Sequence, residues 1–304
     1  VTLVNVKSQA TVNGTLNVGG LFARIEPSSE SSFVFDHCVI EGNISNTGAD
    51  VGGFVGIVHS NDVAVTFTDC ESGSVIEFVG NEGMIGGFIG MTEKNENMKV
   101  SITNCITRGT INAQSDTSGD LFVAGLIGLF LSCIDSSITV KNVRSTGTIT
   151  TEKTMWSVYT GGFFGYVKYC EKFSVTIQQS VSQGKLNVKL IPVNSNYGTY
   201  TGGFIACING NTHATVHIRD CSGMSSIDLS NPSDYGYTSS FIGRFSHNAN
   251  SSITIEHCTN DGSSTFPGSF ANEFYGGGFL GEAYENSGCS LTLKEVTNNV
   301  SMIV

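Results

Sequence analysis

Short apolar runs recur along this chain at a nearly constant spacing. Each repeat opens on a run such as GGFVG, in which glycines stand beside large apolar residues. These runs begin at Gly19, Gly52, Gly86, Ala124, Gly161, Gly202, Ser239 and Gly277. A second run, such as VTFTDC, ends 19 positions after that first residue in seven repeats and 18 positions after Gly52. A looser third run follows, and where it is clearest it ends at Ile44, Ile111, Ile149 and Leu186.

The runs predict three short β-strands per repeat, because they are rich in Val, Ile, Thr and Phe and are separated by Gly, Asn, Asp and Ser. The period of 33–41 residues suits a solenoid in which each strand pairs with its counterpart one coil away. A propeller blade has a similar period of about 40 residues. Its strands form antiparallel hairpins, however, and no Asn-Gly or Asp-Gly turn recurs here. Because equivalent residues recur at the same position in successive repeats, the sequence favours an all-β, right-handed parallel β-helix of eight to nine coils.

Alternation along each strand indicates which side chains fill the coil. In the repeat that opens at Gly52, the residues expected to face the interior are Gly52, Phe54, Gly56 and Val58. In its second run, Val65 and Phe67 are expected inside, and the threonines beside them outside. Phenylalanine rings are then expected to stack from coil to coil where glycine leaves room.

The repeat at Gly86, with GGFIG, SITNC and RGTI, resembles the GLUG repeat of bacterial and protist surface proteins. The likeness covers nearly the whole chain. Two features differ: Phe largely replaces Leu after the double glycine, and the connecting segments are longer. The resemblance implies an extracellular β-helical stalk or adhesin segment, and it implies no catalytic residues.

Composition and charge narrow the classes of function. The net charge of −11 argues against nucleic acid or an anionic membrane surface as a partner, since both attract clustered Lys and Arg. No apolar run approaches the roughly 20 residues of a membrane-spanning helix, so no direct membrane insertion is expected. Residues 1–304 are interpreted as one β-helix repeat domain, a segment of a longer array, because the repeat is cut at both ends.

Length variation is confined to the stretch between the second run and the next repeat, so the longer connections should lie along one side of the solenoid. Just before the opening run of five consecutive repeats, an aromatic column holds Phe122, Tyr159, Tyr200, Tyr237 and Tyr275. One reading is a packed aromatic stack that closes the coil. The other is a carbohydrate-binding strip, with Trp156 and Tyr197 nearby.

Signs of catalysis or metal binding are weak. Asp and Glu are scattered through turns and accumulate in no column. His37 and His257 precede Cys38 and Cys258, and we expect no neighbouring coil to supply a third ligand of metal type. We therefore predict no enzyme activity, no cofactor and no metal site.

The cysteines form two groups. Five occupy the last position of the second run, where Val and Ser stand in other repeats, which favours small buried thiols: Cys38, Cys70, Cys105, Cys221 and Cys258. Stacked neighbours there are also close enough for a disulfide. Among the others, Cys133 and Cys170 share one position of adjacent repeats and are the best disulfide candidate, expected in a loop.

Two hypotheses for function follow. The first is a non-catalytic structural or adhesive segment at the cell surface or outside the cell, contacting other copies or flanking repeats end to end, and host or matrix glycans or proteins. The alternative is a carbohydrate-binding or carbohydrate-processing β-helix that uses its variable-loop side. N-glycosylation sequons are compatible with either, and they stand at Asn13, Asn43, Asn250 and Asn299.

Overall fold

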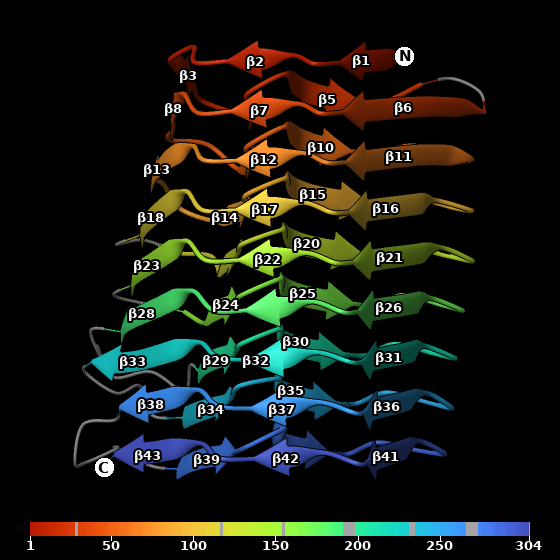
Figure 1. Ribbon diagram of the computed structural model, residues 1–304, viewed down its shortest axis with the longest axis vertical. Coiled ribbons are helices and arrows are strands. Elements are labelled where there is room, and N and C mark those ends of the chain that lie inside the picture. The colour runs from red at the N-terminus through yellow and green to blue at the C-terminus, as the bar shows by residue number, and fades with distance from the viewer. Residues whose placement is uncertain are drawn as a thin grey trace.

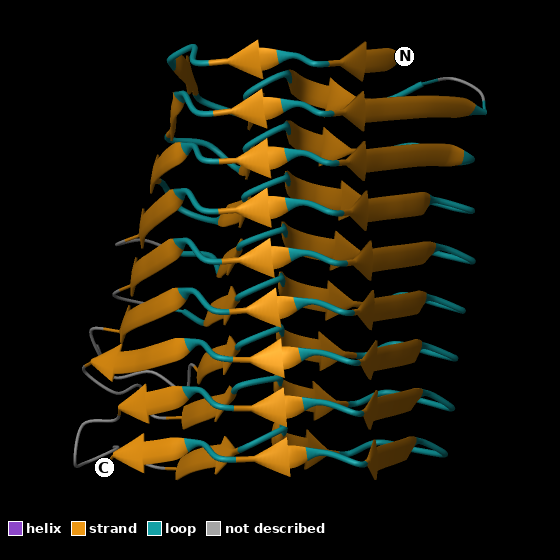
Figure 2. Ribbon diagram, viewed as in Figure 1, coloured by secondary structure: helices purple, strands orange, loops and turns teal. Residues whose placement is uncertain are grey.

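The computed structural model describes residues 1–27, 30–115, 118–153, 156–190, 198–230, 235–265 and 273–303. Within these residues the chain forms 43 strands, β1 to β43, and no helix. All strand pairs are parallel, and the strands stack into five sheets that run the length of the molecule (Figures 1 and 2). The all-β parallel β-helix is confirmed.

Sheets A and B cover the near side and the right-hand part of the view in Figure 1. Sheet A contains β1 (Thr2–Val4), β6 (Ser31–Asp36), β11 (Val63–Thr68), β16 (Lys99–Thr103), β21 (Ser137–Lys141), β26 (Ser174–Gln178), β31 (Thr215–Arg219), β36 (Ser252–Glu256) and β41 (Ser290–Lys294). Sheet B contains β2 (Lys7–Ser8), β7 (Val39–Ile40), β12 (Glu71–Ser72), β17 (Ile106–Thr107), β22 (Arg144–Ser145), β27 (Val181–Ser182), β32 (Ser222–Gly223), β37 (Thr259–Asn260) and β42 (Thr297–Asn298).

Sheets C, D and E complete each coil. Sheet C contains β3 (Val12–Gly14), β8 (Asn43–Asn46), β13 (Val75–Val79), β18 (Thr110–Ser115), β23 (Thr148–Lys153), β28 (Lys185–Leu190), β33 (Ser226–Ser230), β38 (Ser263–Thr265) and β43 (Ser301–Ile303). Sheet D contains β4 (Val18–Gly19), β9 (Asp50–Gly52), β14 (Gly83–Gly86), β19 (Leu121–Ala124), β24 (Val158–Gly161), β29 (Gly198–Gly202), β34 (Tyr235–Ser239) and β39 (Glu273–Gly277). Sheet E contains β5 (Phe22–Ile25), β10 (Val55–Val58), β15 (Ile89–Glu93), β20 (Ile127–Leu131), β25 (Phe164–Lys168), β30 (Ile205–Asn209), β35 (Ile242–Ser246) and β40 (Leu280–Tyr284).

Each coil passes through sheets A, B, C, D and E in that order, giving eight full coils and a ninth made of β41 to β43. In Figure 1 the chain descends from the N-terminus, running leftwards on the near side and returning rightwards on the far side, which is a right-handed coil. The prediction of three strands per coil is wrong, because the coil has five. The opening run bends at its two central residues into a sheet D strand and a sheet E strand, and a two-residue strand of sheet B follows the second run.

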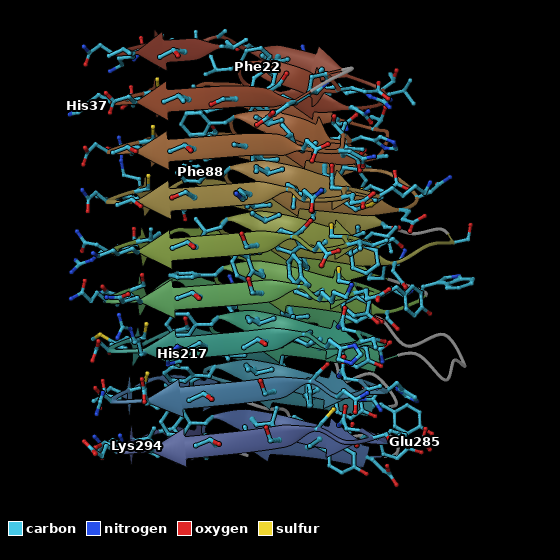
Figure 3. All side chains as sticks on the ribbon, turned by 90° about the vertical axis from the view of Figure 1, so that its right-hand side faces the viewer. Phe22, His37, Phe88, His217, Glu285 and Lys294 are labelled. Atoms are coloured by element: carbon cyan, nitrogen blue, oxygen red, sulfur yellow. The ribbon has the colours of Figure 1, made fainter. Side chains whose placement is uncertain are left out.

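The second run alternates as expected. In β11 the residues Val63, Val65 and Phe67 are buried and the residues between them are half-buried. Aromatic rings stack inside the coil, with centroids 4.7 Å apart for Phe35–Phe67 and 4.8 Å for Phe54–Phe88. Figure 3 shows Phe22 and Phe88 between the layers of the coil, while His37, Lys294 and Glu285 lie at its margins.

The opening run departs from simple alternation. Every residue from Val51 to Val58 is buried, including Ile57, which packs outside the main core. The reason is the bend between sheets D and E. A Cβ on Gly52 would lie 1.8 Å from the carbonyl oxygen of Val55, so only glycine allows the backbone to approach itself this closely.

The prediction that one connection takes up the length variation is confirmed. Between sheets C and D the connection grows from three residues (47–49) to seven (191–197), whereas the connection from sheet E to sheet A keeps four or five. Among the described residues there is no helix long and apolar enough to span a membrane.

Candidate functional site

The outward faces of sheets D and E meet at a concave bend, which we call the outer corner. Sheet D contributes a ladder of side chains to it: Asp50, Met84, Phe122, Tyr159, Tyr200, Tyr237 and Tyr275. Sheet E contributes a facing ladder: Arg24, Ile57, Met91, Leu129, Tyr166, Cys207, Arg244 and Glu282. The two ladders share an apolar cluster separate from the coil interior. The expected aromatic column therefore exists, but it lies outside the coil.

The rings of this column stack face to face. Centroids are 5.0 Å apart for Phe122–Tyr159, 4.5 Å for Tyr159–Tyr200, 4.9 Å for Tyr200–Tyr237 and 5.3 Å for Tyr237–Tyr275, with planes within 17° of parallel. Tyr166 stacks on Tyr159 from sheet E at 4.4 Å. Each ring thus covers the faces of its neighbours, as parallel in-register strands require.

Little of the surface of these rings is accessible to a ligand. Tyr159 and Tyr237 are only 7% and 6% exposed, and burial raises the pKa of both phenols. A sugar ring stacks on an aromatic face, and the faces here are occupied by other rings. Trp156 is 37% exposed, and Tyr197 lies outside the described residues. The carbohydrate-binding role of these residues stays a prediction.

Arg244 lies among the aromatic rings at the C-terminal half of the outer corner. Its guanidinium carbon is 4.5 Å from the ring centroid of Tyr237 and 5.4 Å from that of Tyr284. It also forms an ion pair with Glu282 of the next coil. Cation–π contact and ion pairing together explain how a charged side chain is accommodated in this largely apolar corner.

Asp50 is the buried charge at the opposite end of the outer corner. It is 4% exposed, and its Oδ1 has no hydrogen-bond partner among the described residues. Burial, aided by the charges of Glu93 and Glu82 and opposed by Arg24, raises the pKa of Asp50 to about 7.

We expect Asp50→Asn to stabilise the fold at pH 8 by about 3 kcal/mol and to leave it unchanged at pH 4, given about 1.4 kcal/mol per pKa unit and partial relaxation. Because the folded-state pKa is raised, the wild-type carboxyl lowers the free energy of unfolding progressively as pH rises from about 4 to 7. Urea unfolding of both proteins across this range measures the difference. A pH-independent difference would contradict the assignment.

The cysteine column after sheet A is buried, and its cysteines are unpaired. All nine cysteines are free, and every one except Cys289 is fully buried. The thiols of the column after sheet A also accept backbone hydrogen bonds. The amide of Cys38 donates to Sγ of Cys70 at 3.4 Å, and the amide of Cys70 donates to Sγ of Cys105 at 3.3 Å. Ser180 does the same for the amide of Val143 at 3.1 Å. The prediction of small buried side chains at this position is confirmed. These side chains also accept backbone hydrogen bonds, in addition to filling space in the core.

Cys133 and Cys170 belong to a second buried column, which is mostly asparagine. The column holds Asn95, Cys133, Cys170, Asn211, Asn248 and Asn286 at the start of the connection from sheet E to sheet A. The expected loop placement is confirmed, because both residues lie in connections between strands, and their thiols point into the core. The predicted Cys133–Cys170 disulfide is not formed, since Sγ of Cys170 instead accepts the backbone N–H of Cys133 at 3.4 Å.

We expect Ellman's reagent to modify at most Cys289 in the native full chain. Burial removes access to the other eight thiols and raises the pKa of Cys207 to about 12, which disfavours the reactive thiolate. The same assay in guanidinium chloride is the control and should count nine thiols. Rapid labelling of several thiols without denaturant would contradict the packing described here.

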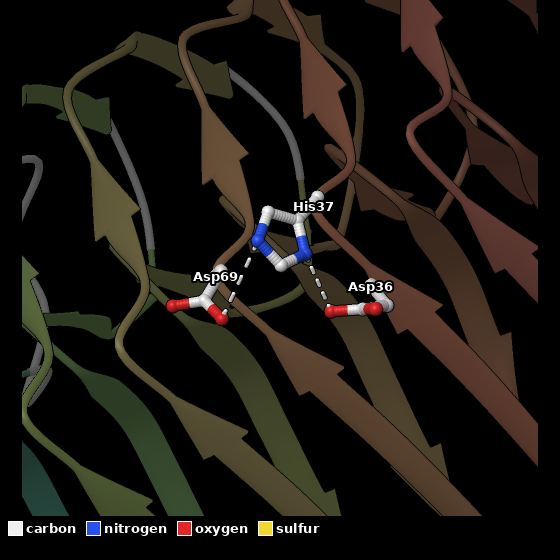
Figure 4. Close-up of side chains that lie close together, drawn as sticks. All are labelled: Asp36, His37 and Asp69. Atoms are coloured by element: carbon white, nitrogen blue, oxygen red, sulfur yellow. Dashed lines mark hydrogen bonds and ion pairs between the residues drawn. The ribbon is translucent and has the colours of Figure 1, made fainter.

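Asp36, His37 and Asp69 come together at the turn after sheet A (Figure 4). Nδ1 of His37 lies 2.8 Å from Oδ1 of Asp36, and this hydrogen bond raises the pKa of His37. Nε2 lies 3.8 Å from Oδ2 of Asp69 in the next coil. The expectation that no neighbouring coil supplies a third ligand-type side chain is therefore wrong: the stacking register places Asp69 directly beside His37.

Two of these residues, His37 and Asp69, occupy a turn position with a left-handed backbone. The residue before the cysteine column has φ of 51° to 55° in all nine coils, and the residues are Asn5, His37, Asp69, Asn104, Asn142, Gln179, Asp220, His257 and Glu295. Asn and Asp tolerate this conformation well. The column of residues before the cysteines can be found in the sequence. The distances between their side chains in neighbouring coils depend on how the coils stack.

The sequon asparagines all lie on the surface: Asn13, Asn43, Asn250 and Asn299. This placement leaves them accessible, and their glycosylation stays a prediction.

No family model, no curated protein and no solved structure matches this chain. The GLUG resemblance therefore stays a prediction that rests on the repeat itself.

Proposed function

We propose that this chain is a non-catalytic structural or adhesive segment of a surface or secreted protein, a stalk or part of a filament. The observation that carries the proposal is the constancy of the coil. Five sheets keep their register through eight full coils, while length variation is confined to the connection between sheets C and D. Such a scaffold holds variable segments along one edge of a rigid spine.

The buried polar groups also support a structural, non-catalytic role. The cysteine and asparagine columns are hydrogen-bonded to the backbone of adjacent coils, as in the bond of 2.8 Å from the amide of Cys170 to Oδ1 of Asn211. Side chains that satisfy the turns of the coil are structural. Under this proposal the partners are flanking repeats or other copies, in end-to-end contact.

Protease treatment of intact cells of the source organism tests the proposed location. We expect the protein to be cleaved while a cytoplasmic marker in the same cells survives. Survival of both until the cells are permeabilised would contradict a surface or extracellular location. Washing the cells and assaying the medium separates a secreted protein from an anchored one.

Carbohydrate binding through the outer corner is the second candidate. It is supported by the run of tyrosines along the sheet that the variable connections enter. A glycan array with the full chain tests it, together with Tyr200→Ala and Tyr237→Ala. The matched control is Tyr169→Ala, because Tyr169 is 57% exposed and belongs to neither ladder. Binding lost in the ladder variants, with folding retained, supports the candidate; lost folding indicates a packing role instead.

A further inference from the structure

We propose that Asp36, His37 and Asp69 form a site for one divalent transition-metal ion of the zinc type, held between Nε2 of His37 and the Asp69 carboxylate. Imidazole nitrogen with carboxylate oxygen is a ligand set for first-row divalent ions, whereas Ca²⁺ and Mg²⁺ favour oxygen ligands alone. The proposed structural function uses none of these three side chains. The site is therefore an additional property of the chain.

The first argument is the gap between the two ligand atoms. Nε2 of His37 and Oδ2 of Asp69 are 3.8 Å apart, longer than the roughly 2.7–3.2 Å of a hydrogen bond. Two ligands that each lie about 2.0–2.2 Å from a shared tetrahedral ion are separated by roughly 3.3–3.6 Å. A small side-chain rotation closes the remaining difference, so the spacing suits an intervening ion without a change of backbone.

The second argument is the orientation of the imidazole. Oδ1 of Asp36 lies 2.8 Å from Nδ1 of His37, which places the ring proton of neutral imidazole on Nδ1. The lone pair is then on Nε2, facing Asp69, in the carboxylate–histidine–metal arrangement. The ligand atoms of all three residues lie within 4.8 Å of one another, so the Asp36 carboxylate that orients the ring also places its negative charge near the ion.

The third argument is that the backbone fixes both ligands. His37 and Asp69 have φ of 53° and 51°, and the amide of His37 donates to the carbonyl oxygen of Thr68 at 2.9 Å. The amide of Asp69 donates to Thr103 at 3.0 Å. The side chains of His37 and Asp69 are 58% and 38% exposed, so water can complete the coordination sphere.

A second histidine in the same column provides an internal comparison. Nε2 of His257 lies 3.0 Å from the Glu295 carboxylate, already at contact distance, and Nδ1 lies 3.6 Å from Asp220. The local charge matches that of the proposed site: one histidine with two carboxylates. A gap remains only beside Nδ1. Among the described residues, Asp36, His37 and Asp69 are the only group whose ligand atoms all lie within 4.8 Å of one another, so we expect no ion at the less compact His257 group.

Calorimetric titration of the full chain with zinc chloride, in a buffer without chelators, tests the proposal. We expect one ion per chain, at least tenfold weaker binding in His37→Asn and in Asp69→Asn, and roughly 10–100-fold weaker binding in Asp36→Asn. Asparagine is the replacement for the two turn residues because Asn104 and Asn142 occupy the same column with φ of 54° and 52°. Thermal unfolding confirms that the variants fold.

His257→Asn is the matched control and should bind as the wild type does. Titration with Co²⁺ adds a spectroscopic readout, because thiolate ligands give a charge-transfer band that nitrogen and oxygen ligands lack. Absence of binding, unchanged binding in His37→Asn, equal loss in His257→Asn, or a thiolate band for the bound ion would each overturn the proposal.

Discussion

Gly162→Val is expected to lower the free energy of unfolding by about 5 kcal/mol, the largest effect of any substitution considered, because it combines overpacking with a backbone clash. A Cβ on Gly162 would lie 1.9 Å from the carbonyl oxygen of Gly203 and 2.2 Å from Oγ of Ser182. Gly162 also donates its amide to Gly202 at 3.0 Å, and this bond holds adjacent coils together at the bend. The Ser182 hydroxyl can rotate away, but the Gly203 carbonyl is backbone and cannot move without separating the coils.

Gly73→Val is the matched control, and we expect a change below about 1 kcal/mol. The three atoms nearest to a Cβ on Gly73 all belong to the Arg108 side chain, at 3.3 Å or more, and that side chain can move. Urea unfolding followed by circular dichroism compares the two variants. Equal losses would show that the bend does not depend on glycine at position 162.

Asn211→Leu is expected to cost about 4 kcal/mol, because each buried group left unpaired costs about 1–3 kcal/mol. Asn211 is fully buried. Its Oδ1 accepts the amide of Cys170 at 2.8 Å, and its Nδ2 donates to the carbonyl oxygen of Val167 at 3.1 Å. Leucine has a similar size and leaves both backbone groups without a partner.

Asn211→Cys is the control, since cysteine fills the same column in two other coils and its sulfur accepts the same bond. We expect it to cost about half as much. Amide hydrogen exchange at Cys170 localises the effect, which matters because a solenoid can open coil by coil. Leucine and cysteine variants of equal stability would contradict the hydrogen-bonding role.

Part of the candidate site could be predicted because stacking turns sequence columns into ladders. Tyr200 and Tyr237, equally placed in successive repeats, are direct partners across sheet D. The asparagine column could have been found the same way, since Asn95 and Asn211 both stand nine residues after the first residue of a repeat. Polar residues in such a column indicate a buried turn that requires side-chain hydrogen bonds.

The amino-acid sequence by itself determined the parallel β-helix, the register of the coils and the single variable connection. These features follow from the spacing of the runs along the chain, because a constant spacing places equivalent residues of successive repeats next to each other in adjacent coils. Tertiary structure alone decided how each coil bends. The bend in each opening run divides it into two strands, and a short sheet B strand after the second run makes the fifth. The bend after Gly161 brings Tyr159 and Tyr166, seven residues apart, face to face outside the core. Contacts between sheets depend on those bend angles, and the linear pattern does not encode them.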